Sequence, residues 1–462
     1  MDLSGKIWRA VYANDTDAFI PEVWAQESLM ILEANMIAGV LVHRNFESEI
    51  ASFGDVVNTR RPANFTGVRK VDADDVTVQD AEATNVPVRL DQHWHTSFLI
   101  KDGEESKSFK SLRETYLEPA LASIAQAIDE VVLMQMYRFI AAGNVVGKLG
   151  TAIGKSTVIA GREVLNNNKA PVTERRFIVC PNMEGDLLAV GDFTKANEVG
   201  DDGTALREGH LGRKFGFDFF MDQNSPTVAA GSTTTAGAVD GSAAVGATTI
   251  PMDGHSGVIA AGTWITIAGD MTPQKVTAAV GGAAPTSLTI SPGLKTAVVD
   301  NAVITFYSPG AINLVAGYAQ YYTKTLVING FTVAPKIGQI VSLDGDAVTA
   351  NNVYGALSTP TTVALLIDRA LSAAVANDAV VGIGPAGDYG WAFHKNAVTL
   401  VTRPLAAPAP GTGALASVAD FNGLSVRVVI TYNGTKQGHL VTVDILGGVE
   451  LLDANLGCLV LG

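Results

Sequence analysis

The segment 227–387 constrains the fold of this chain most strongly, because it carries little charge and repeats itself. About one residue in twelve is charged there, and Gly, Ala, Thr and Val dominate. The string GTWITIAGD at 262–270 returns as GQIVSLDGD at 338–346. Apolar and polar residues alternate in both copies and turn residues close each run, which is typical of short antiparallel strands. We predict an inserted all-β, barrel-like module with copies at about 256–310 and 332–387, forming one barrel or two.

A long amphipathic helix is predicted in the N-terminal flank. The string SLRE at 111–114 matches a capping box, and the apolar stripe that follows ends near Gly143. We expect the helix over about 108–142, with Pro119 at a kink or at the true start. The residues expected on its core face are Leu121, Ile124, Ile128 and Val132.

Between 45 and 101 the pattern indicates an extended β-hairpin arm. Strand-like runs at 56–61, 86–90 and 96–100 flank the stretch 71–80, which is too acidic to enter a core. Two strands alone are marginally stable in water, so the arm requires a partner surface. Its basic and acidic residues are complementary and suit docking to a neighbouring copy. The candidate inter-subunit contacts are Arg60, Arg61, Arg69, Lys70, Asp72, Asp74 and Asp75.

The remaining flanks predict an α+β domain. An amphipathic helix within 17–42, a helix at about 156–167, a strand at 176–180 and a helix at 181–190 precede a strand at 214–221. Beyond the insertion, strands are expected at 389–395, 398–402, 424–432, 439–446 and 458–461. Because strands lie on both sides of the insertion, the two flanks can share one sheet with helices packed on it.

Composition excludes several classes of partner. The 462 residues exceed one ordinary core, so two or three domains are expected. The formal net charge of −14 argues against binding nucleic acid or an anionic membrane through bulk charge. Cys180 and Cys458 lie in apolar runs, which fits buried thiols and folding in the cytosol. We expect no signal peptide and no membrane span.

The sequence motifs that could carry chemistry are weak. GIGPAG at 382–387 matches the dinucleotide fingerprint, but a β pattern follows it where a helix is required. His93 and His95 would share one face of a strand, without a third ligand at motif spacing. The acidic residues at 72–82 lack the order of a calcium loop. We therefore predict no enzyme, no cofactor and no metal.

Several motifs follow one another in a definite order along the flanks. These are IPEVW at 20–24, GDVV at 54–57, FIVCP at 177–181 and WAFHKNA at 391–397. In this order they resemble the tailed-phage major capsid proteins of the Hong Kong 97-type fold. In pattern the chain is most similar to short-tailed phage coat proteins that carry an inserted β-barrel domain at this place.

The resemblance implies a division of the chain into the parts of that fold. They would be an N-arm at 1–44, an E-loop at 45–101 and a peripheral domain at 102–174 that contains the spine helix at about 108–142. The first part of the axial domain would lie at 175–226, the insertion at 227–387 and the remainder of the axial and peripheral domains at 388–462.

The resemblance also implies a function. Copies would join as hexamers and pentamers into an icosahedral virion shell around double-stranded DNA, assembled in the host cytoplasm. A portal protein, a decoration protein and a separate scaffolding protein are the implied partners, with unassisted assembly left open. Two alternatives remain: an encapsulin-like cellular nanocompartment shell on the same fold, and a β-rich carbohydrate-binding surface protein. Shell size, host and maturation chemistry stay open.

Overall fold

The computed structural model of the chain divides into two compact units. It describes residues 21–44, 54–61, 69, 84–101, 113–195, 208–225, 227–228, 234–307, 313–320, 325–329, 340–343, 351–356, 362–367, 371, 373–409, 413–421 and 423–462. The first unit draws on residues 1–36, 44–125 and 398–453, and the second on residues 37–43, 126–397 and 454–462.

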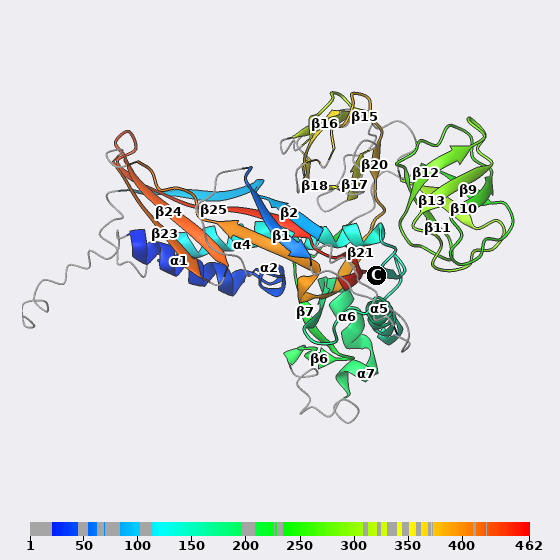
Figure 1. The fold of residues 1–462 in the computed structure, drawn as a ribbon, viewed down its shortest axis with the longest axis horizontal. Helices are drawn as coiled ribbons and strands as arrows, with labels where there is room; N and C mark the ends of the chain where they lie inside the picture. Colours follow the sequence, from blue (N-terminus) through cyan, green and yellow to red (C-terminus); the bar gives the residue numbers. More distant parts are fainter. Residues whose placement is uncertain are drawn as a thin grey trace, which may run out of the picture. The chain divides into compact units, whose positions relative to one another are not determined.

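A five-stranded antiparallel sheet forms the first unit (Figure 1). Its longest strand, β25 (Gly438–Leu451), pairs with β3 (Gln92–Lys101) along one edge. Along its other edge it pairs first with β24 (Leu424–Asn433) and then with β22 (Val398–Arg403). Beyond β24 lies β23 (Ala414–Phe421). Valine and isoleucine residues recur at every second position of β24 and β25, which gives the sheet one buried face.

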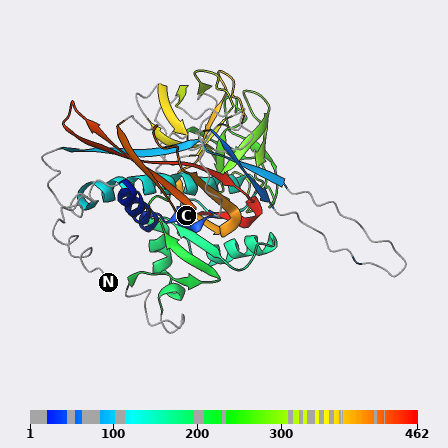
Figure 2. The same cartoon turned by 60° about the vertical axis from the view of Figure 1, so that its left-hand side comes forward.

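Helices cover this buried face of the first unit. The helix α1 (Pro21–Asn35) packs against β23 and β24. The ring of buried Trp24 lies 6.1 Å from that of Phe98 on β3, and Tyr116 stacks on Phe98 at 5.8 Å. The helices therefore lie on one side of the sheet (Figure 2). The residues of β3 that point the other way, such as His93 and Ser97, are more exposed.

The predicted long helix is present as three joined segments. A π-helical turn η3 (Arg113–Leu117) leads into α4 (Glu118–Met134), which tightens into the 3₁₀ segment η4 (Gln135–Ile140). Pro119 stands in the first turn of α4 and so marks a start rather than a mid-helix kink. The helix ends at Ile140, two residues before the predicted end, and residues 108–112 lie outside the described part.

The host part of the second unit is a mixed sheet with helices. Its strand order is β4 (Val145–Gly147), β26 (Gly457–Leu461), β21 (Gly387–His394), β5 (Arg175–Val179), β7 (Phe217–Met221) and β6 (Arg213–Lys214), with β8 (Thr227–Val228) beside β21. The helices are α2 (Ala38–Leu41), α5 (Lys155–Asn167), α6 (Pro181–Ala189) and α7 (Gly191–Thr194). An aromatic cluster of Phe177, Phe193, Phe217 and Phe219 lies in the core between sheet and helices.

Two of the predicted elements are wrong in detail. The single strand expected at 214–221 is a hairpin, because Phe215 and Gly216 adopt φ values of 51° and 82° and reverse the chain between β6 and β7. The N-terminal helix expected within 17–42 ends at Asn35, and α2 is a separate short helix.

The insertion consists of two β-units with one strand order. The first is a closed barrel in the order β10, β13, β12, β11, β14, β9, in which β9 also pairs with β10. Its strands are β9 (Thr234–Val239), β10 (Thr249–Asp253), β11 (Trp264–Ile267), β12 (Gln274–Val280), β13 (Ser287–Ser291) and β14 (Val303–Phe306). The second is a six-stranded sheet in the order β15, β16, β19, β18, β17, β20. Adding six to each strand number of the first barrel gives the same sequence of neighbours, with β15 in the place of β9.

The strands of the second β-unit correspond one to one with those of the first, and several hydrogen bonds between them occur at equivalent positions. They are β15 (Asn313–Leu314), β16 (Leu326–Asn329), β17 (Ile340–Leu343), β18 (Asn351–Ala356), β19 (Thr362–Ile367) and β20 (Val381–Ile383). In the first β-unit the backbone N–H of Val239 donates to the carbonyl of Ala302. The equivalent bond in the second β-unit runs from the N–H of Leu314 to the carbonyl of Ala379. The isolated bridge Ala243↔Val298 likewise has a counterpart in Tyr318↔Val375.

Each β-unit has its own hydrophobic core, and the two cores correspond residue by residue. Leu288, Ile290 and Leu294 of the first core match Leu365, Ile367 and Leu371 of the second. The chain therefore carries two tandem copies of one fold rather than two halves of one barrel. The predicted copy boundaries at 256–310 and 332–387 begin too late, because the first two strands of each copy share a pattern but little sequence.

Candidate assembly interface

One edge of the first unit is open to further pairing. Among the described residues, β23 pairs with β24 alone. Leu415 and Val418 on this strand are 57% and 39% exposed. An unpaired strand edge with exposed apolar side chains is a template for an additional strand.

A groove runs between α1 and this edge strand. It encloses about 580 Å³. Leu29, Met30 and Val418 supply apolar surface, and Met30 is 66% exposed. The polar residues that line the groove are Glu22, Gln26, Glu33, Ser417 and Asp420. The groove thus offers apolar contact with a predominantly acidic rim, which favours a partner segment that carries positive charge.

The hairpin arm consists of β1 (Val56–Arg61) and β2 (Thr84–Arg89). In the described residues these two strands pair only with each other. The exposed amides Asn85 and Asn58 join by a hydrogen bond of 3.1 Å across the hairpin. The third predicted strand, within 96–100, does not extend the arm, because β3 pairs with β25.

The root of the arm is anchored in the first unit. The backbone N–H of Gly54 donates to the carbonyl of Leu90 at 2.7 Å, and the N–H of Leu90 donates to the backbone carbonyl of Asp55 at 2.8 Å. The side chains of Val88 and Leu90 pack with Val401 and Leu446 in a small core. Beyond this root, β1 and β2 form a two-stranded sheet, and no third strand pairs with them in the described part of the chain. The arm is fixed at one end and lacks a described partner at the other.

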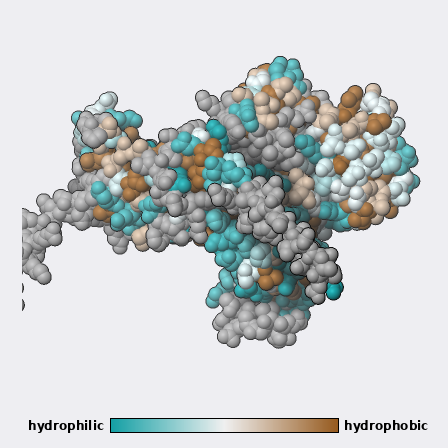
Figure 3. Space-filling view, in the orientation of Figure 1, coloured by the Kyte–Doolittle hydropathy of each residue, from teal (hydrophilic) through white to brown (hydrophobic). Residues whose placement is uncertain are grey.

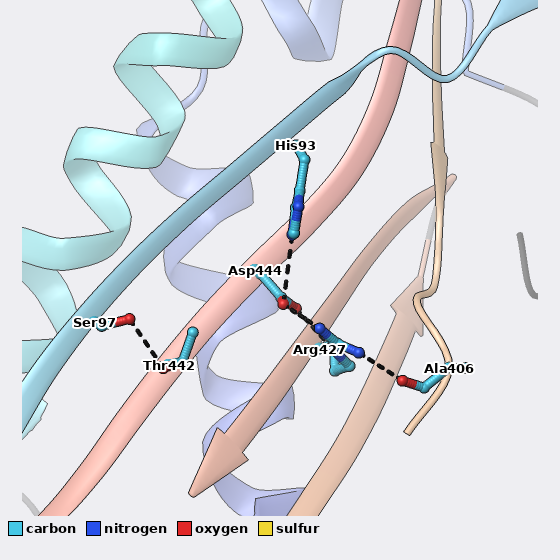
Figure 4. A network of polar contacts seen from close by, with 6 residues as sticks. All are labelled: His93, Ser97, Ala406, Arg427, Thr442 and Asp444. Carbon is cyan, nitrogen blue, oxygen red and sulfur yellow. Dashed lines mark hydrogen bonds and ion pairs between the residues drawn. The ribbon is translucent and has the colours of Figure 1, made fainter. Parts of the chain in front are cut away.

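A polar network lies on the face of the sheet that points away from the helices (Figure 4). Arg427 binds both carboxylate oxygens of Asp444, with Nε 2.9 Å from Oδ1. It also donates through Nη1 to the carbonyl of Ala406 at 2.5 Å. His93 reaches Asp444 from the neighbouring strand at 3.5 Å. The network connects β3, β25, β24 and the segment after β22.

The insertion presents a surface that is poor in charge. Figure 3 shows its first barrel largely in pale and brown tones. Several valines of this barrel are exposed: Val245, Val258, Val280, Val299 and Val303. A surface of this kind makes contacts through shape and apolar area rather than through ion pairs.

The remaining chemical candidates do not assemble into a site. His93 and His95 lie with ring centroids 6.1 Å apart, and in the described part of the chain no three His, Cys, Asp or Glu side chains gather as metal ligands. The segment 384–386 leads directly from β20 into β21, so no helix follows the glycine motif. Burial raises the pKa of Cys458 to about 12, which makes it a poor nucleophile. No described helix is long and apolar enough to cross a membrane.

Comparisons with known proteins find similarity in structure. No family model matches the chain, and no curated protein matches it. It is similar to a structure from Mycobacterium phage Che8, with 12% identity and a TM-score of 0.42 over 92% of this chain and 90% of that one. It is also similar to the capsid structure of the cyanophage P-SCSP1u, with 10% identity and a TM-score of 0.39 over 91% and 90%. The mature capsid of bacteriophage PhiM1 gives 10% identity and a TM-score of 0.36 over 91% and 89%. Two of these three are capsid structures.

The predicted contact residues are only partly described. Arg60 and Arg61 lie on β1, and Arg69 is exposed. Lys70, Asp72, Asp74 and Asp75 lie outside the described residues. Leu121, Ile124, Ile128 and Val132 on α4 are at most 2% exposed.

Sequence reasoning missed the polar groups that the fold buries. Asp444 and Arg427 stand 17 residues apart in sequence, and only the register of β24 and β25 brings them together. Asp129 was visible as a carboxylate within the apolar stripe of the long helix, and this was the available signal for a buried charge.

Proposed function

We propose that this chain is the major capsid protein of a tailed bacteriophage and acts by self-association into a closed shell. The observation that carries the proposal is the hairpin arm, which is anchored at its root and pairs with no third strand among the described residues. A two-stranded hairpin in water is marginally stable by itself. A neighbouring copy would supply the missing surface.

The first unit offers complementary surfaces for such a neighbour. The edge of β23 can accept a strand, and the acidic groove beside α1 can accept a basic segment. The arm carries Arg60, Arg61, Arg69 and Lys70. Obligate interfaces of this kind typically bury about 2,000 Å² or more, and charge complementarity between the surfaces sets their register.

The finer assignments belong to the same proposal. Copies join as hexamers and pentamers, the shell encloses double-stranded DNA in the virion, and assembly in the host cytoplasm involves a portal protein and a scaffolding or decoration protein. The net charge of −14 suits a shell that contains DNA without gripping it, because tight binding of phosphates requires clustered Lys and Arg. The role is structural rather than catalytic.

Electron microscopy of the purified chain, with sedimentation, tests the proposal. We expect closed shells, or capsomers that close on addition of the remaining head proteins. Particles isolated from infected cells should contain DNA. A protein cargo in place of DNA would favour the nanocompartment, and a stable monomer under all conditions would contradict self-association.

A shortened arm tests which element drives assembly. Val57 pairs with Val88, so replacing 58–87 by Asn-Gly closes a tight hairpin and retains the anchored root. We expect a folded subunit with unchanged melting temperature that forms no shells. The control is Asn58→Ala, which removes one exposed hydrogen bond and should still assemble. Shells of normal yield from the shortened variant would contradict the role of the arm.

A further inference from the structure

Two equivalent strands of the insertion are buried on their outer faces. Every second residue of β11 and of β17 belongs to the hydrophobic core of its own β-unit. Successive side chains of a strand point to opposite faces, so the residues in between point outwards. These are Trp264 and Thr266 on β11 and Ile340 and Ser342 on β17, and each is at most 1% exposed. An outer surface that is this deeply buried packs against another part of the molecule.

The two β-units are in direct contact at this surface. Nε1 of Trp264 donates to the hydroxyl of Ser342 at 3.1 Å, and this hydroxyl donates to the backbone carbonyl of Gly262 at 3.2 Å. A buried indole N–H requires such an acceptor. Gly382, the direct partner of Ser342 in the register of β17 and β20, lies so close to Gly262 that a Cβ there would overlap its carbonyl oxygen. The contact therefore requires glycine at position 382.

The strand register allows the two copies to be compared residue by residue. Between β11 and β14, Thr266 is paired with Thr305, and at the same place between β17 and β20 Ser342 is paired with Gly382. The backbone hydrogen bonds that follow these strand pairs are equivalent as well. The corresponding residues are Trp264 and Ile340, Thr266 and Ser342, Thr305 and Gly382, and Tyr307 and Gly384.

The residues at these equivalent positions are larger in the first β-unit than in the second. The hydroxyls of Thr266 and Tyr307 form a hydrogen bond of 3.0 Å, so side chains of the first β-unit cover its own surface. In the second β-unit, Gly382 and Gly384 have no side chains, which lets the backbone beside Ser342 approach a partner closely. Only the second β-unit therefore presents this surface uncovered.

The contact between the two β-units is not reciprocal. In a two-fold symmetric contact, the residue at 340 would bind the residue at 266 as Trp264 binds Ser342. Ile340 has no side-chain donor, and Thr266 bonds to Tyr307 of its own β-unit. The contact thus has two different sides. We call Gly262 and Trp264 the receptor surface, and Ser342 and Gly382 the inserted surface.

We propose that the two copies have diverged to form a directional junction within each chain, and that this junction makes the insertion one rigid body. The receptor surface of the first β-unit binds the inserted surface of the second. Residues 308–312 alone separate Tyr307 from β15. A linker this short gives an effective concentration on the order of millimolar, which favours the junction within one chain over the same junction between chains. The proposal rests on contacts within the insertion and does not depend on the function proposed above.

Distances between two spin labels on the full chain test the junction. Val299→Cys in the first β-unit and Val315→Cys in the second replace side chains that are 71% and 45% exposed. The native thiols of Cys180 and Cys458 are buried and should stay unlabelled. Diluting labelled chain with unlabelled chain restricts pulsed electron paramagnetic resonance to distances within one chain. We expect a single narrow distance distribution, and a broad one would overturn the rigid junction.

Gly382→Thr restores the residue type that the first β-unit carries at the equivalent position, Thr305. Its side chain would collide with the carbonyl of Gly262, so we expect the distance distribution to broaden while the far-ultraviolet circular dichroism stays unchanged. The control Ala376→Thr introduces the same side chain at an exposed position of the second β-unit and should keep the narrow distribution. An equally narrow distribution in Gly382→Thr would overturn the proposal.

Ser342→Ala tests the junction without adding bulk. It removes the hydroxyl that joins Trp264 to Gly262 and leaves a buried indole N–H without its acceptor. We expect a distribution broader than that of the wild type and narrower than that of Gly382→Thr. A wild-type distribution in Ser342→Ala would contradict the junction even if Gly382→Thr failed to fold.

Mixed, singly labelled chains test whether the junction forms within one chain. One sample carries only Val299→Cys and the other only Val315→Cys, and the two are assembled together without unlabelled chain. We expect no signal at the distance measured within the doubly labelled chain. The same distance between singly labelled chains would show that neighbouring copies exchange their β-units, and would overturn the assignment of the junction to a single chain.

Discussion

Arg427 and Asp444 illustrate how one residue pair can organise a whole face of the first unit. They are direct partners in the register of β24 and β25, and the side chain of Asp444 is only 5% exposed. A bidentate guanidinium contact of this kind fixes geometry as well as charge. His93 approaches the same carboxylate from β3, although His95 is the direct partner of Asp444 in the register. One carboxylate thus holds three neighbouring strands.

Removal of the guanidinium should expose the cost of burying Asp444. We expect Arg427→Met to lower the free energy of unfolding by about 3 kcal/mol, because a nearly buried carboxylate loses its main partner. The double variant Arg427→Met with Asp444→Leu should recover most of this loss, because no buried charge remains. Urea unfolding of all three proteins measures the difference. Equal stability of Arg427→Met and the wild type would mean that water or His93 satisfies Asp444.

At the scale of elements, the long helix is the part that the sequence predicts best. Its apolar stripe has the helical period, and burial follows that stripe from Leu117 to Phe139. We expect Ile128→Ala to destabilise the chain by about 2 to 5 kcal/mol, since the side chain is 0% exposed and leaves a cavity. Exposed Gln126→Ala is the control and should change melting little. Similar melting of both variants would contradict the core position of Ile128.

Other elements show where prediction from sequence stops. The β6–β7 hairpin was missed because Phe215 at positive φ breaks an otherwise continuous apolar run, and aromatic residues seldom adopt that conformation. The strands β9 and β15 were missed because their copies share a pattern but not a sequence. The Arg427 network was missed for a third reason. It joins residues that are distant along the chain, and their proximity depends on a strand register that local patterns do not encode.

At the scale of the whole molecule, the insertion is a pair of tandem β-units attached to the host through neighbouring strands. Val228 on β8 pairs with Gly387 on β21, so the chain leaves and returns at adjacent points of the same strand pair. Each β-unit also has a separate hydrophobic core. The two β-units of the insertion are in contact through Ser342 of the second β-unit. Its hydroxyl accepts from Nε1 of Trp264 at 3.1 Å and donates to the carbonyl of Gly262 at 3.2 Å, both in the first β-unit.

This attachment predicts that the host folds without the insertion. Joining Val228 to Gly387 through Asn-Gly deletes 229–386 and converts β8 and β21 into a tight hairpin with the pairing retained. We expect a soluble host with the far-ultraviolet signal of the α+β part and cooperative melting. The matched control deletes only 309–380, which removes the second β-unit up to β20 and leaves the first barrel closed. This deletion removes Ser342, so Nε1 of Trp264 loses its hydrogen-bond acceptor and the melting temperature of the first barrel should fall slightly. An insoluble host, together with a soluble control, would show instead that the first barrel guides folding of the sheet around β21.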